Sequence, residues 1–229
     1  MPTILISGFG PFPGAPYNPT IRLVERLARL RRPALADVRI VGHVFETGYA
    51  GVDRDLPALI AKYRPDALLM FGLAARTKYI RIETRARNAL ALLPDASGAV
   101  LRRSVIAPGA PLDRMMPAPQ RRLLAAARNA GVPVRLSRDA GRYLCNYLCW
   151  RASEVGGPKL AAFVHVPLVK RHPRPTTHSV HSRESGNPVL GALGPRFRGD
   201  ERRMIVTVED LFNVGSRLLV TMAAAVNRT

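Results

Sequence analysis

Three short, continuous runs of apolar residues constrain the fold of this chain most strongly. They cover residues 3–7, 66–72 and 159–166, and each contains β-branched or aromatic residues. Runs of this kind are typical of strands buried on both faces of a parallel sheet. Segments with apolar residues at helical spacing lie between them, for example residues 18–31 and 49–63. The alternation predicts an α/β fold with a mostly parallel central sheet.

Further strands and helices are expected where the patterns are shorter. Four more strands are predicted, at residues 38–45, 79–83, 99–105 and 132–137. Apolar and polar residues alternate in the strand at 79–83, so we expect it to be half-exposed. Two more helices are predicted, at about residues 119–130 and 207–227. Thr207 and Asp210 have the spacing of a capping box that opens the last helix.

The length and composition bound the class of protein. At 229 residues, the chain is long enough for one α/β domain with a sizeable core and short for two. Its 47% of hydrophobic residues exclude a wholly disordered chain. No apolar run approaches the roughly 20 residues of a membrane span, and the N-terminus lacks the basic segment of a signal peptide. Two cysteines cannot form a disulfide framework, so we expect a cytoplasmic protein without a membrane partner.

The net charge of +19 would suit a partner such as nucleic acid. Most of this charge comes from arginines scattered over the predicted helices and loops. No helix-turn-helix, zinc-finger or RNA-binding sheet motif organises them. We therefore expect no specific nucleic-acid partner, and at most weak, salt-sensitive attraction.

A strand-to-helix junction places a cysteine where a nucleophile could work. The turn from Asp139 to Gly141 follows the predicted strand at 132–137, and Asp139 is a candidate helix cap. Cys145 then falls in the first turn of the helix, where backbone N–H groups and the helix dipole favour a thiolate. The alternative is that Cys145 is a small buried hydrophobe, as free cysteines usually are. Cys149 is expected in the core, because Cys-x-x-x-Cys is not the usual spacing of zinc or dithiol sites.

Two other polar side chains lie near the ends of predicted strands. Glu83 ends the strand at 79–83, and His165 lies near the end of the strand at 159–166. Taken singly, Glu83 could form an ordinary ion pair and His165 could be a hydrogen-bonded core residue. Strand ends are also where residues distant in the sequence converge. The alternative interpretation is that a cysteine, a histidine and a carboxylate meet there.

Two aromatic residues lie in a glycine- and proline-rich loop after the first predicted strand. Phe9 and Phe12 could form a wall of an apolar pocket at the carboxyl end of the sheet. The alternative is a loop that folds onto its own core.

Residues 170–203 interrupt the alternation of strands and helices. The segment is rich in glycine, proline and arginine and shows neither helical nor strand periodicity. It resembles the translated form of a dispersed bacterial palindromic repeat. We expect a disordered insertion in a single domain of residues 1–229, tolerated because lengthening a surface loop costs little free energy. Although the segment contains His172, His178 and His181, we expect no metal site.

Several short motifs together resemble the pyrrolidone-carboxylate peptidases, a family of cysteine peptidases also called pyroglutamyl-peptidase I. The most specific are Gly8-Phe-Gly-Pro-Phe12 and Ala140-Gly-Arg-Tyr-Leu-Cys-Asn146. Glu83, Asn88 and His165-Val-Pro167 match as well, and the glutamate, the cysteine and the histidine follow one another in the order found in the family. The resemblance covers nearly the whole chain except residues 170–203. It implies a three-layer α/β/α sandwich that often forms tetramers, so a homodimer or homotetramer is expected. It also implies removal of an N-terminal pyroglutamyl residue from peptides, without a cofactor or metal.

The same resemblance assigns roles to particular residues. Cys145 matches the nucleophile, His165 the general base and acid, and Glu83 the group that orients the histidine. The residues that match the wall of the pocket for the lactam ring of the substrate are Phe9, Phe12, Leu73, Tyr143 and Leu144.

The chain departs from the family pattern at two places, one before Glu83 and one after it. A double glycine is replaced by Ala75 and Arg76, and an arginine is replaced by Leu93, a loss for which Arg85 or Arg87 could compensate. Two rival functions therefore stay open. One is a small amidase or thiol hydrolase with another acyl substrate, and the other is a basic binding protein with weak catalysis.

Overall fold

The computed structural model describes residues 1–12, 14–154, 158–169 and 206–228. The predicted insertion at residues 170–203 lies outside this part of the chain, and so do its three histidines. Within the described residues, no helix is both long and apolar enough to cross a lipid bilayer.

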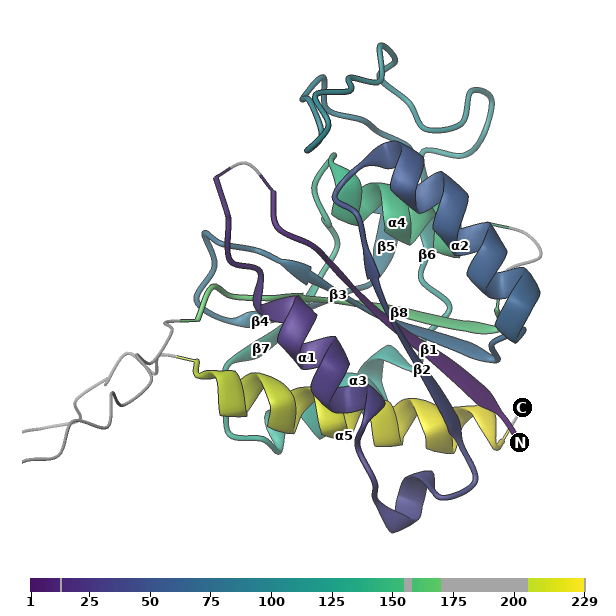
Figure 1. The fold of residues 1–229 in the computed structure, drawn as a ribbon, viewed down its shortest axis with the longest axis vertical. Coiled ribbons are helices and arrows are strands. Elements are labelled where there is room, and N and C mark those ends of the chain that lie inside the picture. The colour runs from purple at the N-terminus through teal and green to yellow at the C-terminus, as the bar shows by residue number, and fades with distance from the viewer. Residues whose placement is uncertain (13, 155–157, 170–205, 229) are drawn as a thin grey trace, which may run out of the picture.

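A six-stranded sheet forms the centre of the molecule, in the order β2-β1-β3-β8-β4-β7 (Figure 1). Its strands are β1 Thr3–Phe9, β2 Arg39–Phe45, β3 Ala67–Leu73, β4 Ile80–Glu83, β7 Val134–Ser137 and β8 Leu160–Val166. Neighbouring strands are parallel except β4 and β8, which pair antiparallel. The predicted mostly parallel sheet is therefore confirmed.

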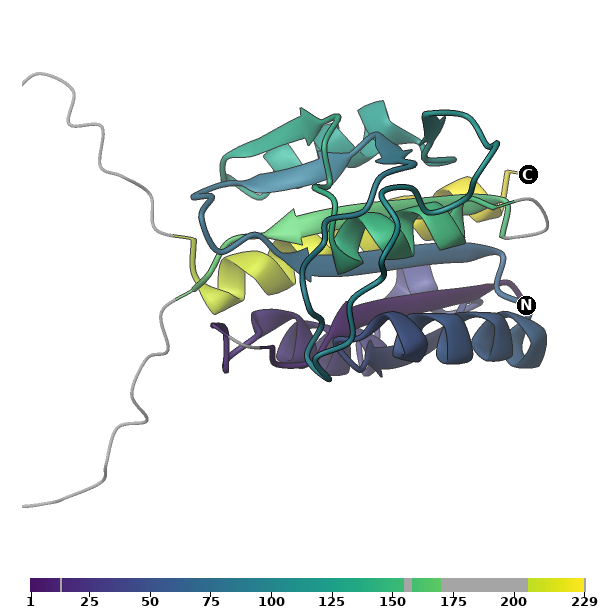
Figure 2. The same cartoon turned by 90° about the horizontal axis from the view of Figure 1, so that it is seen from above.

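Helices cover both faces of the sheet, as Figures 1 and 2 show. One face carries α1 Pro19–Ala28, α3 Gln120–Arg128 and α5 Val208–Val226, and the other carries α2 Tyr49–Tyr63 and α4 Leu144–Ala152. A short 3₁₀ helix, η1 Pro33–Leu35, precedes β2. This arrangement is a three-layer α/β/α sandwich, which confirms the predicted fold class.

The apolar runs of the sequence are explained by two hydrophobic cores, one on each face of the sheet. Ile4 and Ile6 of β1 face α1, α3 and α5, whereas Leu5 between them faces α2 and α4. β3 behaves in the same way, with Leu69 and Leu68 on opposite faces. Since successive side chains of a strand point to opposite faces, a strand covered on both sides must be apolar throughout.

Two helices begin where their sequences predict caps. Asn18 accepts a hydrogen bond from the N–H of Thr20 at the start of α1, at 3.1 Å. Thr207 and Asp210 form a reciprocal capping box at the start of α5. Each cap satisfies N–H groups that have no partner within the helix.

The predicted strand at residues 99–105 is wrong. Backbone groups of this region bond to a side chain and to nearby backbone rather than to a neighbouring strand: Asp95 accepts from the N–H of Ala99 at 3.0 Å, and the N–H of Arg103 donates to the carbonyl of Leu101 at 2.8 Å. Such local side-chain acceptors compete with a ladder of strand hydrogen bonds. A small two-stranded sheet lies elsewhere, formed by β5 Arg85–Arg87 and β6 Asp113–Met115.

The expectation that residues 79–83 form a half-exposed strand is also wrong. β4 lies between β8 and β7, and Ile80, Ile82 and Glu83 are all 0% exposed. The polar positions of the alternating pattern face a buried site rather than solvent.

Candidate active site

The start of α4 presents Cys145 to the site. Tyr143 occupies the N-cap position with extended backbone (φ −115°, ψ −160°), and its side chain does not cap the helix. The N–H groups of the first turn therefore lack partners within the helix and add to the positive end of its dipole. Cys145 is partly exposed, whereas Cys149, one turn further, is fully buried. Burial raises the pKa of the Cys149 thiol, which suits an inert core residue.

The expectation that Asp139 caps this helix is wrong. Its Oδ1 accepts a hydrogen bond from the N–H of Gly141 at 2.9 Å, and its Oδ2 lies 3.2 Å from Arg87. The first contact closes a turn in which Gly141 has φ +86°, a conformation that glycine adopts without steric cost. Because the Asp139 carboxylate closes this turn, it does not accept hydrogen bonds from the first N–H groups of α4, which begins at Leu144.

Gly72 of β3 makes room for the sulfur of Cys145. A Cβ atom at this position would lie 2.9 Å from Cys145 Sγ and 2.6 Å from Cζ of Phe163. Gly72 is also the direct partner of His165 in the pairing of β3 with β8. The missing side chain therefore lets α4 and the sulfur of Cys145 approach the sheet beside the histidine.

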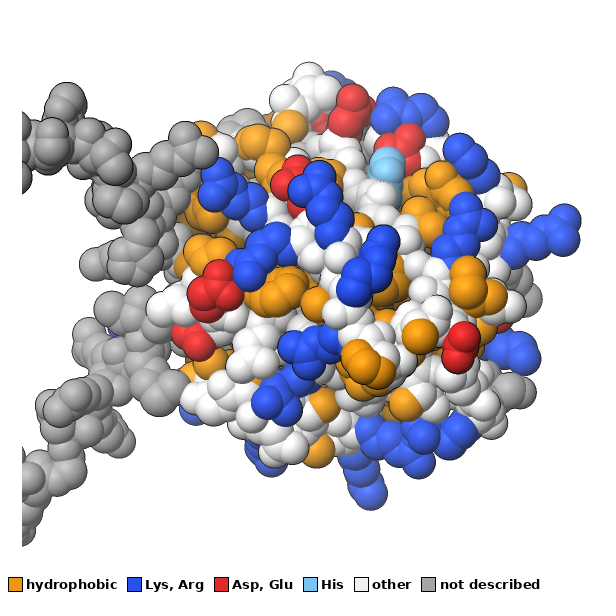
Figure 3. Space-filling view, turned by 60° about the horizontal axis from the view of Figure 1, so that its bottom comes forward, with side chains coloured by type: hydrophobic (Ala, Val, Ile, Leu, Met, Phe, Trp, Pro, Cys, Tyr) orange, Lys and Arg blue, Asp and Glu red, His pale blue; other side chains and the backbone are white. Residues whose placement is uncertain are grey.

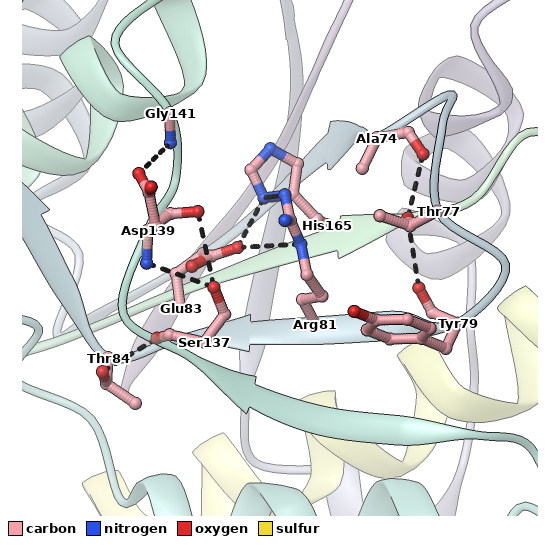
Figure 4. A network of polar contacts seen from close by, with 10 residues as sticks. All are labelled: Ala74, Thr77, Tyr79, Arg81, Glu83, Thr84, Ser137, Asp139, Gly141 and His165. Atoms are coloured by element: carbon pink, nitrogen blue, oxygen red, sulfur yellow. Dashed lines mark hydrogen bonds and ion pairs between the residues drawn. The ribbon is translucent and has the colours of Figure 1, made fainter.

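Glu83 of β4 and His165 of β8 form a buried pair (Figure 4). Oε1 of Glu83 lies 2.7 Å from Nδ1 of His165, and the two side chains are 0% and 4% exposed. Both residues were expected near the ends of different strands. β4 and β8 run antiparallel, with Glu83 opposite Phe163. Glu83 therefore reaches His165 as a diagonal neighbour on the same face of the sheet.

His165 interacts with Cys145 as well as with Glu83. Burial alone would lower the pKa of the imidazole, but the charge of Cys145 and a hydrogen bond with it, followed by the hydrogen bond and charge of Glu83, raise this pKa to about 9. Figure 4 shows the other ring nitrogen of His165 pointing away from Glu83. A protonated imidazole held in this way can stabilise a thiolate, the nucleophilic form of cysteine.

The residues predicted to form the pocket wall fall into two groups. Phe9 and Leu144 are buried in the hydrophobic core between the sheet and α2 and α4, and Tyr143 and Cys145 pack against the same core. The hydroxyl of Tyr143 donates to the carbonyl of Pro94 at 2.9 Å, which fixes its ring.

Phe12 and Leu73 form the second group, since neither belongs to that core. Both are half-buried. Phe12 makes backbone hydrogen bonds with Ala15 that close a small turn, and Leu73 ends β3 directly after Gly72.

Asn146 is a structural residue of the site whose role the sequence analysis missed. It is 0% exposed, its Oδ1 accepts from the N–H of Arg87 at 2.8 Å, and its Nδ2 donates to the carbonyls of Arg87 and Ala89 at 2.8 and 3.0 Å. These bonds tie α4 to β5 and to the residues that follow it. The available signal was an amide side chain directly after the cysteine, in a helix whose other residues up to Trp150 are apolar or aromatic.

The arginines proposed to replace the one lost at Leu93 are engaged elsewhere. Arg85 forms an ion pair with Asp113 at 2.6 Å, and Arg87 pairs with Asp139. Leu93 itself is 55% exposed. The guanidinium that lies beside the histidine belongs to Arg81, which the sequence analysis did not single out.

The donor atoms of this site suit acid–base and nucleophilic chemistry. Among the described residues, no group of three or more histidine, cysteine, aspartate or glutamate side chains is arranged to hold a metal ion. A thiol, an imidazole and a carboxylate in a row can exchange protons and form a covalent bond with an acyl group.

Comparison with known proteins gives a consistent result. A family model described as pyroglutamyl peptidase matches residues 2–188. The chain is 31% identical to the pyrrolidone-carboxylate peptidase of Pyrococcus furiosus over 171 residues, which cover 72% of this chain and 81% of the relative. It is 33% identical to that of Deinococcus radiodurans over 173 residues, which cover 73% and 78%.

Solved structures resemble the fold as well. A mutant pyrrolidone carboxyl peptidase from P. furiosus superposes with a TM-score of 0.66 at 30% identity, covering 73% of this chain and 81% of that one. The pyroglutamyl peptidase I of Bacillus amyloliquefaciens superposes with a TM-score of 0.74 at 23% identity, covering 98% of each chain, and supports the fold alone.

Proposed function

Because this chain belongs to the pyroglutamyl peptidase family and is a peptidase, we propose that it removes the N-terminal pyroglutamyl residue from peptides. In this proposal Cys145 is the nucleophile, His165 is the general base and acid, and Glu83 orients His165. No cofactor takes part.

One observation carries the proposal: the buried contact of 2.7 Å between His165 Nδ1 and Glu83 Oε1, with Cys145 interacting with the same imidazole. The three side chains come from β8, β4 and α4. A nucleophile, a base and a group that orients the base are the parts that covalent acyl transfer requires. An ordinary ion pair between histidine and glutamate would not need a thiol at a helix start beside it.

In the first half of the reaction, the proton of the Cys145 thiol resides on His165 and the thiolate attacks the pyroglutamyl carbonyl carbon. The backbone N–H of Cys145, in the first turn of α4, is a candidate donor to the oxyanion that forms. The imidazolium then protonates the nitrogen of the leaving amine, the C–N bond breaks, and a thioester remains on Cys145.

In the second half, neutral His165 takes a proton from water, and the resulting hydroxide adds to the thioester carbonyl. The C–S bond breaks, free pyroglutamate leaves, and the proton returns from His165 to the sulfur of Cys145. Glu83 holds the ring through Nδ1 in both halves, so that Nε2 always serves the reacting atoms.

The apolar surroundings of Cys145 support a preference for the pyroglutamyl group. Its lactam ring carries no charge, whereas an ordinary N-terminus carries an ammonium group. Placing that ammonium against Phe9, Tyr143 and Leu144 without a partner would cost several kcal/mol. Phe12 and Leu73 are proposed to complete the wall.

A set of matched fluorogenic amides tests the proposal. We expect release of fluorophore from a pyroglutamyl amide and at least about 100-fold slower release from the prolyl amide, which has the same ring size but a charged amine and no lactam carbonyl. Iodoacetamide labelling of Cys145, read by mass spectrometry, is measured in parallel. Rapid labelling with no pyroglutamyl cleavage would favour an amidase with another acyl substrate. Slow labelling together with salt-sensitive binding of nucleic acid would favour a basic binding protein.

A further inference from the structure

Arg81 of β4 lies against the pair formed by Glu83 and His165 (Figure 4). Its Nε is 3.3 Å from Oε1 of Glu83, and its terminal NH2 nitrogen is 3.2 Å from Nδ1 of His165. The side chain is 23% exposed. It is therefore a mostly buried cation at the inner end of the site.

The strand register explains this position. Arg81 is directly opposite His165 in the antiparallel pairing of β4 with β8. Arg81 and Glu83 are two residues apart on β4, so they point to the same face of the sheet. Both therefore flank the imidazole, Arg81 as its direct cross-strand neighbour and Glu83 as its diagonal neighbour.

The hydrogen-bonding capacity of these groups fixes what Arg81 can do. A ring nitrogen that donates its proton to Glu83 cannot also accept one from Arg81. The Arg81 cation therefore acts on His165 through space and on Glu83 through an ion pair at Oε1.

Glu83 needs such a cation. Its side chain is 0% exposed, and its Oε2 has no hydrogen-bond partner among the described residues. A buried carboxylate without compensation is costly. When His165 has given its proton to the leaving amine, Arg81 is the cation that remains in contact with this carboxylate.

The charged and titratable groups that face His165 come from three elements. β4 contributes Arg81 and Glu83, and α4 contributes Cys145 and the fully buried Cys149. β7 adds Arg135, the partner of Arg81 in the neighbouring strand pair, which is exposed to solvent. Cys145 and Glu83 raise the pKa of the imidazole, and Arg81 is the close cation among the described residues that opposes them.

We propose that Arg81 is a positioning residue that holds the Glu83 carboxylate by an ion pair, directed at Nδ1 of His165, while it weakens the hold of the imidazole on its proton. This inference rests on the proposed function, because its benefit is the return of His165 to a neutral base before water attacks the thioester. With a pKa of His165 already raised to about 9, a still more stable imidazolium would slow that step.

Replacing the cation by a neutral group tests the inference. In Arg81→Gln, we expect the pKa of the His165 imidazole to rise by about one unit, because a like charge within hydrogen-bonding distance has been removed. The alkaline limb of kcat/KM on a pyroglutamyl amide should move upward with it, and kcat should fall about tenfold. Arg81→Lys should keep both pH values near those of the wild type. Arg81→Met is the second neutral variant should the glutamine variant fail to fold.

The imidazole itself is titrated by NMR on protein labelled with ¹⁵N-histidine, with the His165 signal assigned by its absence in His165→Asn. This titration does not require turnover. An inactive wild type would contradict the proposed function, and the effect of Arg81 on the pKa of His165 could still be measured. Arg135→Met is the matched control, since it removes the same charge one strand further away, where solvent screens it. If the pKa of His165 is unchanged in the neutral variants, or shifts as much in Arg81→Lys as in Arg81→Gln, the charge of Arg81 does not act on the imidazole and the proposal is wrong.

Discussion

At the scale of single residues, the site depends on a buried histidine that holds its proton at neutral pH. The pKa of His165 is raised to about 9, because Cys145 and Glu83 together outweigh burial. In an unfolded chain the pKa of a histidine is about 6.5. The titration of His165 is therefore linked to the stability of the folded chain.

The first prediction concerns this pH dependence. Since the folded pKa lies above the unfolded one, the contribution of His165 to stability is complete below about pH 6.5 and is lost as pH rises through about 9. We expect the free energy of unfolding, measured in urea between pH 6 and 9.5, to fall by roughly 3 kcal/mol from this source. His165→Asn should flatten the curve across this window, and an equally steep decline in that variant would show that other groups cause it.

A second prediction at this scale concerns Gly72. In Gly72→Ala the new Cβ would collide with the ring of Phe163 and the sulfur of Cys145. Displacing the sulfur by about 1 Å should lower kcat/KM on a pyroglutamyl amide about 100-fold. Overpacking should lower the free energy of unfolding by about 1–3 kcal/mol.

The control for Gly72 is Gly10→Ala, where the nearest atom to a new Cβ is the carbonyl oxygen of Phe45 at 3.5 Å, an ordinary contact. We expect this variant to keep most of its stability. Normal kinetics in Gly72→Ala would mean that the sulfur does not need the space over β3.

At the scale of elements, the parallel part of the sheet could be predicted and the antiparallel part could not. β1, β3 and β8 are buried and mostly apolar because they are covered on both faces, and this leaves a clear signal in the sequence. The direction of β4 leaves no such signal, since Ile80 and Ile82 alternate with polar residues as they would in an exposed strand. Strand direction depends on pairing with distant residues rather than on local pattern.

The same limit applies to the candidate site. Cys145, His165 and Glu83 could be selected individually from motifs, and the structure brings Glu83 and His165 into contact. Arg81 could not be selected, because only the register of β4 against β8 places it opposite His165. Asp139 was misassigned because a turn and a helix cap use the same side chain in the same local sequence.

A third prediction tests the connection between α4 and β5. Asn146→Ala would leave the N–H and carbonyl of Arg87 and the carbonyl of Ala89 without their side-chain partner. We expect the free energy of unfolding to fall by about 3 kcal/mol, since buried polar groups without partners each cost about 1–3 kcal/mol. Asn213→Ala on the exposed surface of α5 is the control and should change stability by less than about 0.5 kcal/mol. Equal effects of the two substitutions would contradict the role given to Asn146.

At the scale of the whole molecule, the high positive charge is spread out. Figure 3 shows lysine and arginine side chains mixed with acidic and hydrophobic ones over the face that it presents. Several arginines are already paired with carboxylates, including Arg26 with Glu209 at 2.7 Å. We therefore keep the expectation of at most weak, salt-sensitive attraction to nucleic acid.

The fourth prediction concerns residues 170–203. The chain on either side is anchored, since Val169 and Val206 are 2% and 5% exposed and belong to the same hydrophobic core. In Figures 1 and 2, the chain that leaves β8 and the chain that enters α5 lie side by side. We expect a chain in which a short glycine–serine linker replaces residues 170–203 to fold and to be at least as active, because shortening a loop costs little free energy.

Thermal melting and the pyroglutamyl amide assay compare the shortened chain with the full one. A melting temperature lower by more than a few degrees, or a loss of activity, would show that these residues contribute to the fold or to the site.

The proposed attack of Cys145 on the pyroglutamyl carbonyl can be tested by a comparison of two cysteine substitutions. Hydrolysis of a fluorogenic pyroglutamyl amide is followed for the wild type, for Cys145→Ala and for Cys149→Ala as the matched cysteine substitution. We expect activity in the wild type, a loss of at least about 10⁴-fold in Cys145→Ala, and no comparable loss in Cys149→Ala. Cleavage by Cys145→Ala at a rate close to that of the wild type would contradict the proposed attack.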